Sequence, residues 1–186
     1  ATRRARGHPQ GVLGVTLATH STGRVSWFGG RGERLLSPGR YSSLVANVVG
    51  LTIAVVGAGI AASGVVDAID GGPDVLVLLL TGVVVWAVGS VMWRTTIVPK
   101  QIRILDVFTT VTLAWVAMAI AGAIPYLLTG HFDRIDDALF ESISGFTTTG
   151  ATVTPDIEAT SQGLLFWRST TQWMGGMGVI VLVVAV

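Results

Sequence analysis

The sequence contains no cysteine, and only 12% of its 186 residues are charged. Without cysteine, disulfide bonds, thiolate metal ligands and cysteine nucleophiles are all excluded. The three histidines, His8, His20 and His131, are scattered and have no clustered carboxylate partners, so they predict no metal site. The acidic residues likewise lack a paired histidine or nucleophile, which argues against an enzyme. Nucleic acid is not an expected partner.

Long apolar stretches dominate what is present, since 51% of the residues are hydrophobic. Four stretches contain no Asp, Glu, Lys or Arg over a length sufficient to cross a bilayer: 41–66, 75–93, 107–130 and 169–186. A membrane-spanning helix needs about 20 predominantly apolar residues. The sequence therefore predicts an all-α, multi-pass membrane protein in contact with the lipid bilayer.

The formal net charge of +1 conceals an uneven distribution. Residues 1–40 carry seven arginines and one acidic residue, a net of +6, whereas the remainder carries five basic and ten acidic residues, a net of −5. Because basic residues in short loops remain cytoplasmic, residues 1–40 are predicted to form a cytoplasmic, disordered tail. The connection that holds Asp67, Asp70 and Asp74 is then expected to lie outside.

A polar segment separates the third apolar stretch from the fourth, and its first part has an amphipathic pattern. Four apolar residues recur at helical spacing: Ile135, Leu139, Ile143 and Phe146. We therefore expect a short pore helix at 134–145 that reaches about halfway through the hydrocarbon core, with Asp133 as its N-cap. If this segment lines a path for ions, Asp133, Asp136 and Asp137 would make the outer entrance of that path electronegative.

The six residues TTTGAT at 147–152, called the filter segment below, follow this helix. A threonine run favours extended backbone, and Gly150 can adopt a positive φ. Six such residues alone are more typical of a surface loop. However, irregular backbone at membrane depth is tolerated where it lines an aqueous path, and a ring of carbonyls can replace the hydration shell of potassium. This context favours an ion filter.

Two motifs on either side of Gly150 carry a resemblance to a known family: DALFESISGFTTTGATV at 137–153 and LLFWRSTTQWMGGMGVIVL at 164–182. Through them the sequence resembles the Trk, Ktr and HKT superfamily of cation transporters, and particularly the Trk membrane subunits. The resemblance implies four repeats of helix, pore helix, filter and helix, preceded in the Trk branch by two extra helices. It covers about residues 41–186.

On this reading the chain has three parts, and it looks like the N-terminal fragment of a longer protein. They are the tail at 1–40, a two-helix membrane hairpin at 41–103, and a first pore repeat at 104–186. The repeat would comprise a helix at 104–129, the pore helix, the filter segment and a second helix, truncated, at 164–186. The implied function is potassium uptake across the bacterial plasma (inner) membrane. A non-transporting membrane scaffold or regulatory fragment is the alternative.

The resemblance also implies the site and its partners. Potassium, the transported ion and the only metal expected, would bind backbone carbonyls of Thr148 and Thr149, and also of Thr147 and Gly150, the single filter glycine of the repeat. Support for the filter is expected from four residues: Ala151, Thr152, Glu141 and Arg168. Implied partners are a second full-length chain, giving a homodimer, and a cytosolic nucleotide-binding regulatory subunit of the TrkA type.

Arg168 is open to two interpretations from the residues alone. It stands near the outer start of the fourth apolar stretch, where its long side chain could reach the interface. Alternatively, its guanidinium pairs with the carboxylate of Glu141, because both are charged groups in otherwise apolar surroundings. The pair would clamp the pore helix behind the filter segment.

Overall fold

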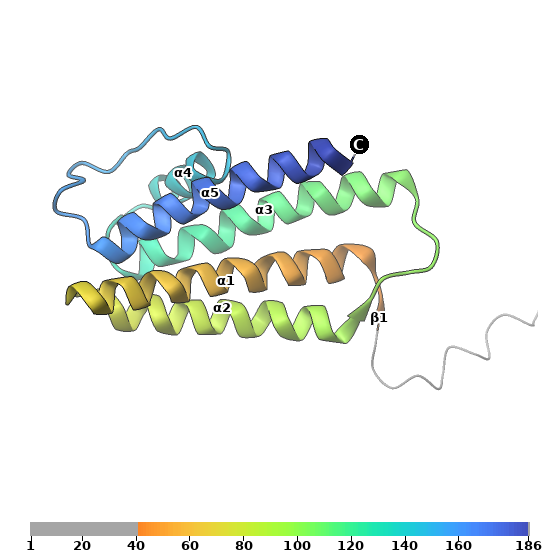
Figure 1. The fold of residues 1–186 in the computed structure, drawn as a ribbon, viewed down its shortest axis with the longest axis horizontal. Coiled ribbons are helices and arrows are strands. Elements are labelled where there is room, and N and C mark those ends of the chain that lie inside the picture. Colours follow the sequence, from red (N-terminus) through yellow and green to blue (C-terminus); the bar gives the residue numbers. More distant parts are fainter. Residues whose placement is uncertain (1–40, 186) are drawn as a thin grey trace, which may run out of the picture. The chain divides into compact units, whose positions relative to one another are not determined.

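The structure, a computed structural model, describes residues 41–185, so the predicted tail at 1–40 lies outside the described residues. The regular secondary structure of the described part is helical apart from one pair of two-residue strands, which confirms the predicted all-α class (Figure 1). In chain order its elements are β1 Tyr41–Ser42, α1 Leu44–Asp70, α2 Val75–Thr95, β2 Thr96–Ile97, α3 Ile104–Leu128, α4 Ile135–Phe146 and α5 Gln162–Ala185.

The first two helices form an antiparallel hairpin with direct backbone contact. A Cβ atom at Gly82 of α2 would collide with the backbone of Ala61, and one at Gly89 would collide with the backbone of Ala54. Small residues at such positions let membrane helices approach closely. Close packing matters because lipid provides no hydrophobic force to drive the helices together. The hairpin turns at Gly71, whose φ of 75° is the left-handed conformation usual after a helix.

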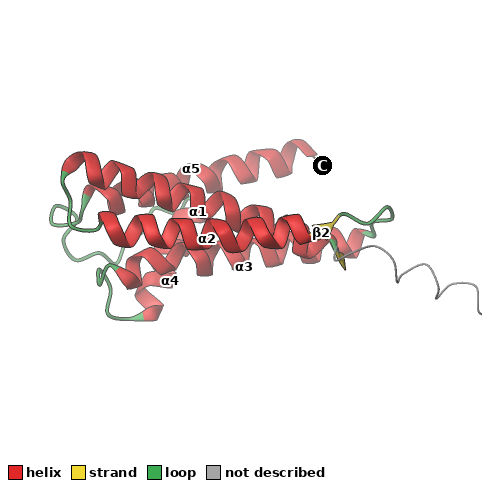
Figure 2. Ribbon diagram, turned by 90° about the horizontal axis from the view of Figure 1, so that it is seen from below, coloured by secondary structure: helices red, strands yellow, loops and turns green. Residues whose placement is uncertain are grey.

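The start of α1 differs from the predicted first span, which began at residue 41. Tyr41 and Ser42 are extended and pair in parallel with Thr96 and Ile97, and the helix begins only at Leu44. Ser43 caps it by accepting a hydrogen bond from the backbone N–H of Ala46 at 3.2 Å. Figure 2 shows this strand pair at the end of the bundle opposite to α4.

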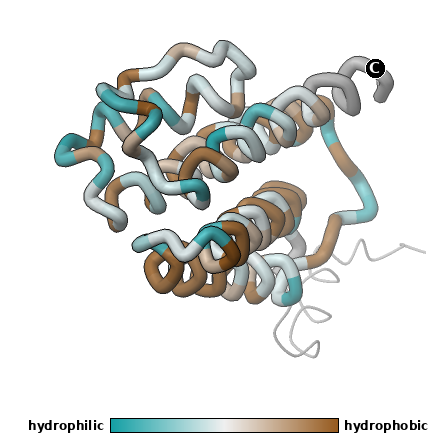
Figure 3. Tube along the Cα trace, turned by 60° about the vertical axis from the view of Figure 1, so that its left-hand side comes forward, coloured by the Kyte–Doolittle hydropathy of each residue, from teal (hydrophilic) through white to brown (hydrophobic). Residues whose placement is uncertain are grey.

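Three of the described helices, α1, α2 and α3, are long and apolar enough to cross a membrane. Figure 3 shows mostly hydrophobic residues along α1 and α2, with hydrophilic residues in the connections and also on the other helices. The fourth predicted span falls within α5, whose side chains from 179 onward lie outside the described part. The predicted helix at 104–129 corresponds to α3, which ends at Leu128.

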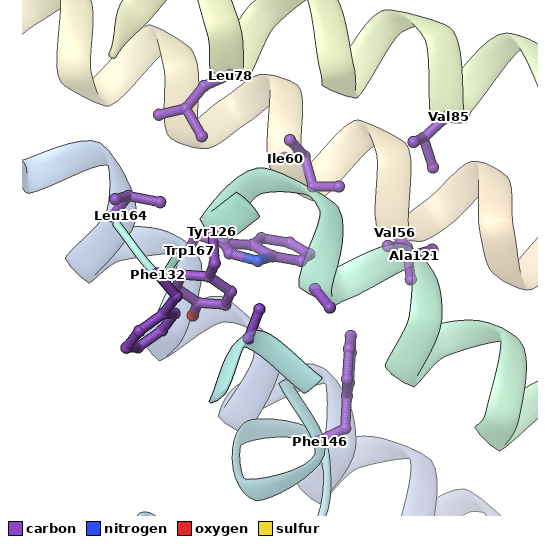
Figure 4. Close-up of a cluster of buried hydrophobic side chains, with 12 residues drawn as sticks. Val56, Ile60, Leu78, Val85, Ala121, Tyr126, Phe132, Phe146, Leu164 and Trp167 are labelled. Carbon is purple, nitrogen blue, oxygen red and sulfur yellow. The ribbon is translucent and has the colours of Figure 1, made fainter. Parts of the chain in front are cut away.

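The main core gathers buried side chains from all five helices, α1 to α5 (Figure 4). Trp167 of α5 is fully buried there, and its indole N–H donates to the carbonyl of Gly122 in α3 at 3.0 Å. Its ring meets Phe146 of α4 edge to face, with centroids 6.3 Å apart. Gly59 of α1 leaves room for the indole, since a Cβ there would lie 3.0 Å from Trp167 Cζ3. One side chain thus fixes α5 against three other helices.

Candidate functional site

The short helix α4 begins one residue later than predicted, at Ile135 instead of 134, and ends at Phe146 instead of 145. The prediction that Asp133 caps it was wrong, because the N-cap is Arg134, which makes no side-chain capping bond. Arg134 instead pairs with the carboxylate of Asp136 in the first turn. This hydrogen bond lowers the pKa of Asp136 below its ordinary value. The carboxylates of the first turn also complement the positive end of the helix dipole.

Helix α4 is held closely between α3 and α5. Ser142 donates its hydroxyl hydrogen to the carbonyl of Ala119 in α3 at 2.8 Å. On the other side, a Cβ at Gly145 would overlap the hydroxyl of Thr171, and one at Gly175 would overlap the carbonyl oxygen of Phe146. The two glycines therefore allow α5 to lie directly against the C-terminal turn of α4, immediately before the filter segment.

The filter segment begins with a helix-capping motif. The N–H of Thr149 donates to the carbonyl of Ser144 at 3.0 Å, and the N–H of Thr148 donates to that of Gly145 at 2.9 Å. This is the bond pattern of the Schellman motif, in which the residue after the cap adopts the left-handed conformation. Thr148 occupies that place with a φ of 58°. A β-branched residue there is rare, and such conformations cost about 1–3 kcal/mol.

The extended backbone predicted for the threonine run is therefore wrong at its start. Thr147 is the helix cap, with φ −78° and ψ 0°, and Thr148 is left-handed. The free carbonyls in the last turn of α4 explain this, because the N–H groups of the threonines are the nearest donors for them. Gly150 has the positive φ expected of it, 75°.

Glu141 is the buried centre of the site, with a side chain 1% exposed. Its two carboxylate oxygens accept from the hydroxyl of Thr152 at 3.1 and 3.0 Å. One oxygen also accepts from the backbone N–H of Val153 at 3.1 Å. A buried carboxylate persists only when its lone pairs are satisfied. Here the donors come from the chain beyond Gly150, so Glu141 ties α4 to the far end of the filter segment.

The predicted ion pair between Arg168 and Glu141 is present, with Arg168 Nε 2.6 Å from Glu141 Oε1. A second nitrogen of the guanidinium, Nη2, donates to the carbonyl of Gly150 at 3.0 Å. The carbonyl of Ala151 accepts from the hydroxyl of Ser144 at 2.5 Å. The four residues expected to support the filter thus belong to one hydrogen-bonded frame of α4, α5 and the filter segment.

The structure brings the potassium-ligand candidates together on an exposed stretch. Residues 147–152 are all exposed in the described chain. The hydroxyls of Thr147 and Thr149 lie 2.8 Å apart. Among the proposed carbonyl ligands, that of Gly150 already accepts from Arg168. A carbonyl has two lone pairs, so one remains available to a cation.

One buried charged residue was missed by the sequence analysis, which placed Asp67 in an outer loop. Asp67 lies in α1 and is fully buried. Its carboxylate accepts from the backbone N–H of Asp74 and from that of Gly163, each at 2.9 Å. The second contact joins residues 96 positions apart. No local pattern signals such a contact.

The chain is similar to known cation transport proteins. A family model, TrkH, described as a cation transport protein, matches residues 76–186. The Trk system potassium uptake protein TrkI of Halomonas elongata is 34% identical over 119 residues, which is 63% of this chain and 24% of the relative. TrkH of Escherichia coli K12, also a Trk system potassium uptake protein, is 39% identical over 102 residues, 54% of this chain and 21% of the relative.

The fold also matches a solved structure. The crystal structure of the potassium transporter TrkH from Vibrio parahaemolyticus matches with a TM-score of 0.70 at 32% sequence identity. The match covers 76% of this chain and 31% of that chain. The chain therefore spans less than a third of the proteins that it resembles.

Proposed function

This chain belongs to the TrkH family of cation transport proteins, and from that premise we propose that it supplies the first of four pore repeats in a potassium uptake protein. Its relatives include proteins described as Trk system potassium uptake proteins. The observation that carries the proposal is the half-length helix α4, followed by an exposed irregular segment that a buried ion pair holds in place.

The electrostatics of α4 suit a cation at the filter segment. The last carbonyls of a helix carry the negative end of its dipole, and α4 ends directly at Thr147. We assign the carbonyls of Thr148 and Thr149 as the main ligands of potassium, with those of Thr147 and Gly150 as additional ligands. Glu141, Thr152, Ala151 and Arg168 support them without touching the ion.

The wider organisation follows the same proposal. Residues 41–103 form the two-helix hairpin that precedes the pore, residues 104–186 form the repeat, and residues 1–40 lie on the cytoplasmic side of the bacterial inner membrane. The basic connection with Arg94, Lys100 and Arg103 supports this orientation, since such residues remain cytoplasmic. A homodimer of full-length chains and a cytosolic nucleotide-binding regulatory subunit of the TrkA type complete the proposal.

A substitution of Gly150 distinguishes potassium uptake from the alternative function, that of a non-transporting membrane scaffold. The nearest heavy atom to a Cβ at Gly150 is Gln172 Nε2 at 3.9 Å, so alanine meets no steric obstacle except its own backbone. Gly130, in the loop after α3, is a matched control because its φ is 71° and nothing lies within 4 Å of its Cβ position. Alanine at either position costs about 1–2 kcal/mol in the left-handed conformation.

The test is rubidium uptake by full-length protein in potassium-depleted cells, with membrane abundance measured in parallel. We expect Gly150→Ala to reduce rubidium uptake and discrimination against sodium strongly, and Gly130→Ala to leave both near the wild-type level. The reason is that only Gly150→Ala alters the backbone of the filter segment, whose carbonyl groups are the proposed ligands of the ion. Equal uptake by the two variants at equal abundance would favour the scaffold.

A further inference from the structure

The carboxylate of Asp67 links the N-terminal hairpin of α1 and α2 to α5, the helix that follows the filter segment. Oδ2 accepts from the N–H of Asp74, the N-cap residue of α2. Oδ1 accepts from the N–H of Gly163, the second residue of α5. Both distances are 2.9 Å, and Asp67 is fully buried. The N-terminal hairpin therefore holds the first turn of the helix that follows the filter segment.

The start of α5 needs such a partner. The first four N–H groups of a helix have no acceptor within the helix, and a carboxylate near them is favoured by the helix dipole. The local capping bond is weak, because Leu164 N lies 3.4 Å from the hydroxyl oxygen of Ser161. Asp67 thus provides the shorter of these two bonds, from a residue 96 positions earlier in the chain.

The fit at Gly163 leaves no space for another side chain. A Cβ there would lie 2.6 Å from the Cβ of Asp67 and 2.6 Å from Cδ1 of Leu78. Contacts this short cannot form unless α5 or the facing side chains of the hairpin shift. The position of the α5 N-terminus is therefore determined by hydrogen bonding and by steric contact together.

This position is transmitted to the filter segment through one turn of helix. Trp167 and Arg168 follow Gly163 by four and five residues, which corresponds to a rise of about 6–7.5 Å. Trp167 packs against α1, α3 and α4, and Arg168 donates to Glu141 and to the carbonyl of Gly150. A shift at Gly163 changes the place where the guanidinium meets that carbonyl.

We propose that Asp67 is a positioning residue for ion selection: by fixing the first turn of α5 it sets the contact between Arg168 and the Gly150 carbonyl. The hairpin α1–α2 then takes part in selectivity in addition to spanning the membrane. This inference rests on the proposed function of the filter segment.

The test uses the full-length protein and compares Asp67→Asn with Asp70→Asn. Both changes remove one carboxylate from the end of α1, but Asp70 is exposed. Asparagine at 67 keeps one acceptor oxygen and turns the other into a donor that faces a backbone N–H. Rubidium and sodium uptake are measured in the same cells, so their ratio does not depend on abundance. We expect the ratio of rubidium to sodium uptake to fall severalfold in Asp67→Asn, because the weakened hold on Gly163 moves Arg168 relative to the Gly150 carbonyl, and to stay at the wild-type value in Asp70→Asn.

Gly163→Ala gives a second perturbation that leaves the carboxylate in place, and it should lower the ratio in the same direction. An unchanged ratio in Asp67→Asn would overturn the inference. So would failure of that variant to accumulate in the membrane, because Asp67 would then serve folding. Absence of rubidium uptake by the wild type and by Asp70→Asn would instead refute the proposed function itself.

Discussion

Removal of Arg168 should destabilise the protein far more than removal of an exposed arginine. Arg168→Met deletes the 2.6 Å contact with Glu141 and the 3.0 Å bond to the Gly150 carbonyl. It leaves the Glu141 carboxylate, 1% exposed, with only the hydroxyl of Thr152 and the N–H of Val153 as donors. Breaking one side of a buried pair costs about 3–5 kcal/mol. Because the side chain of Arg168 is 23% exposed, solvent screening lowers our expectation to about 2–4 kcal/mol.

A double-mutant cycle combines this change with Glu141→Gln, which keeps an oxygen that can accept from Thr152 and Val153 but removes the charge. The double variant leaves no uncompensated charge in the site. Its loss of stability should therefore be smaller than the sum of the two single losses, by about 1–3 kcal/mol. Rubidium uptake should be low in Arg168→Met and in the double variant alike, because both lack the guanidinium that donates to the Gly150 carbonyl.

The assay is chemical unfolding of full-length protein in detergent, followed by tryptophan fluorescence, to which the buried Trp167 contributes. Arg134→Met is the control, since its pair with Asp136 is exposed, with side chains 71% and 64% accessible. We expect no measurable loss for that variant. Strictly additive losses, or an Arg168→Met loss no larger than that of the control, would refute the account of the buried clamp.

Two further predictions concern residues that flank α4. Thr148→Gly should raise the free energy of unfolding by about 1 kcal/mol, because glycine adopts the left-handed conformation without the penalty that a β-branched residue incurs; a loss of stability on chemical unfolding would contradict the assigned backbone. Burial lowers the pKa of His131 below its ordinary value of 6.5, against the opposing influence of Glu141 and Asp74. The unfolded chain then binds the proton more readily, so the stability contributed by His131 is complete above about pH 6.5 and decreases as the pH falls below it. The difference in melting temperature between wild type and His131→Gln should grow from pH 5 to pH 8, and parallel curves would show that His131 does not titrate this way.

Much of the fold follows from charge placement and apolar periodicity. Asp74 precedes α2, which runs as predicted from residue 75. Arg94 lies in its last turn, and the helix ends at Thr95, two residues beyond the predicted span. The apolar spacing from Ile135 to Phe146 located α4 to within one residue. In contrast, the start of α1 was displaced because Tyr41 and Ser42 pair with β2, a contact between residues distant in the sequence.

Contacts of the candidate site were predictable where the chemistry of two residues requires them, and not where only the fold creates them. Glu141 and Arg168 were paired because two charges in apolar surroundings need each other. Thr148 in the left-handed conformation runs against its intrinsic preference, so no propensity rule would find it. Asp67 was invisible for another reason: only the fold brings Gly163 to its carboxylate.

The most direct test of the central claim is a crystal structure of the full-length protein grown with rubidium, with the ion located by its anomalous scattering. We expect rubidium on the axis enclosed by four repeats, within coordination distance of the carbonyl oxygens of Thr148 and Thr149. Rubidium density elsewhere, or a filter segment whose carbonyls face lipid, would contradict the account.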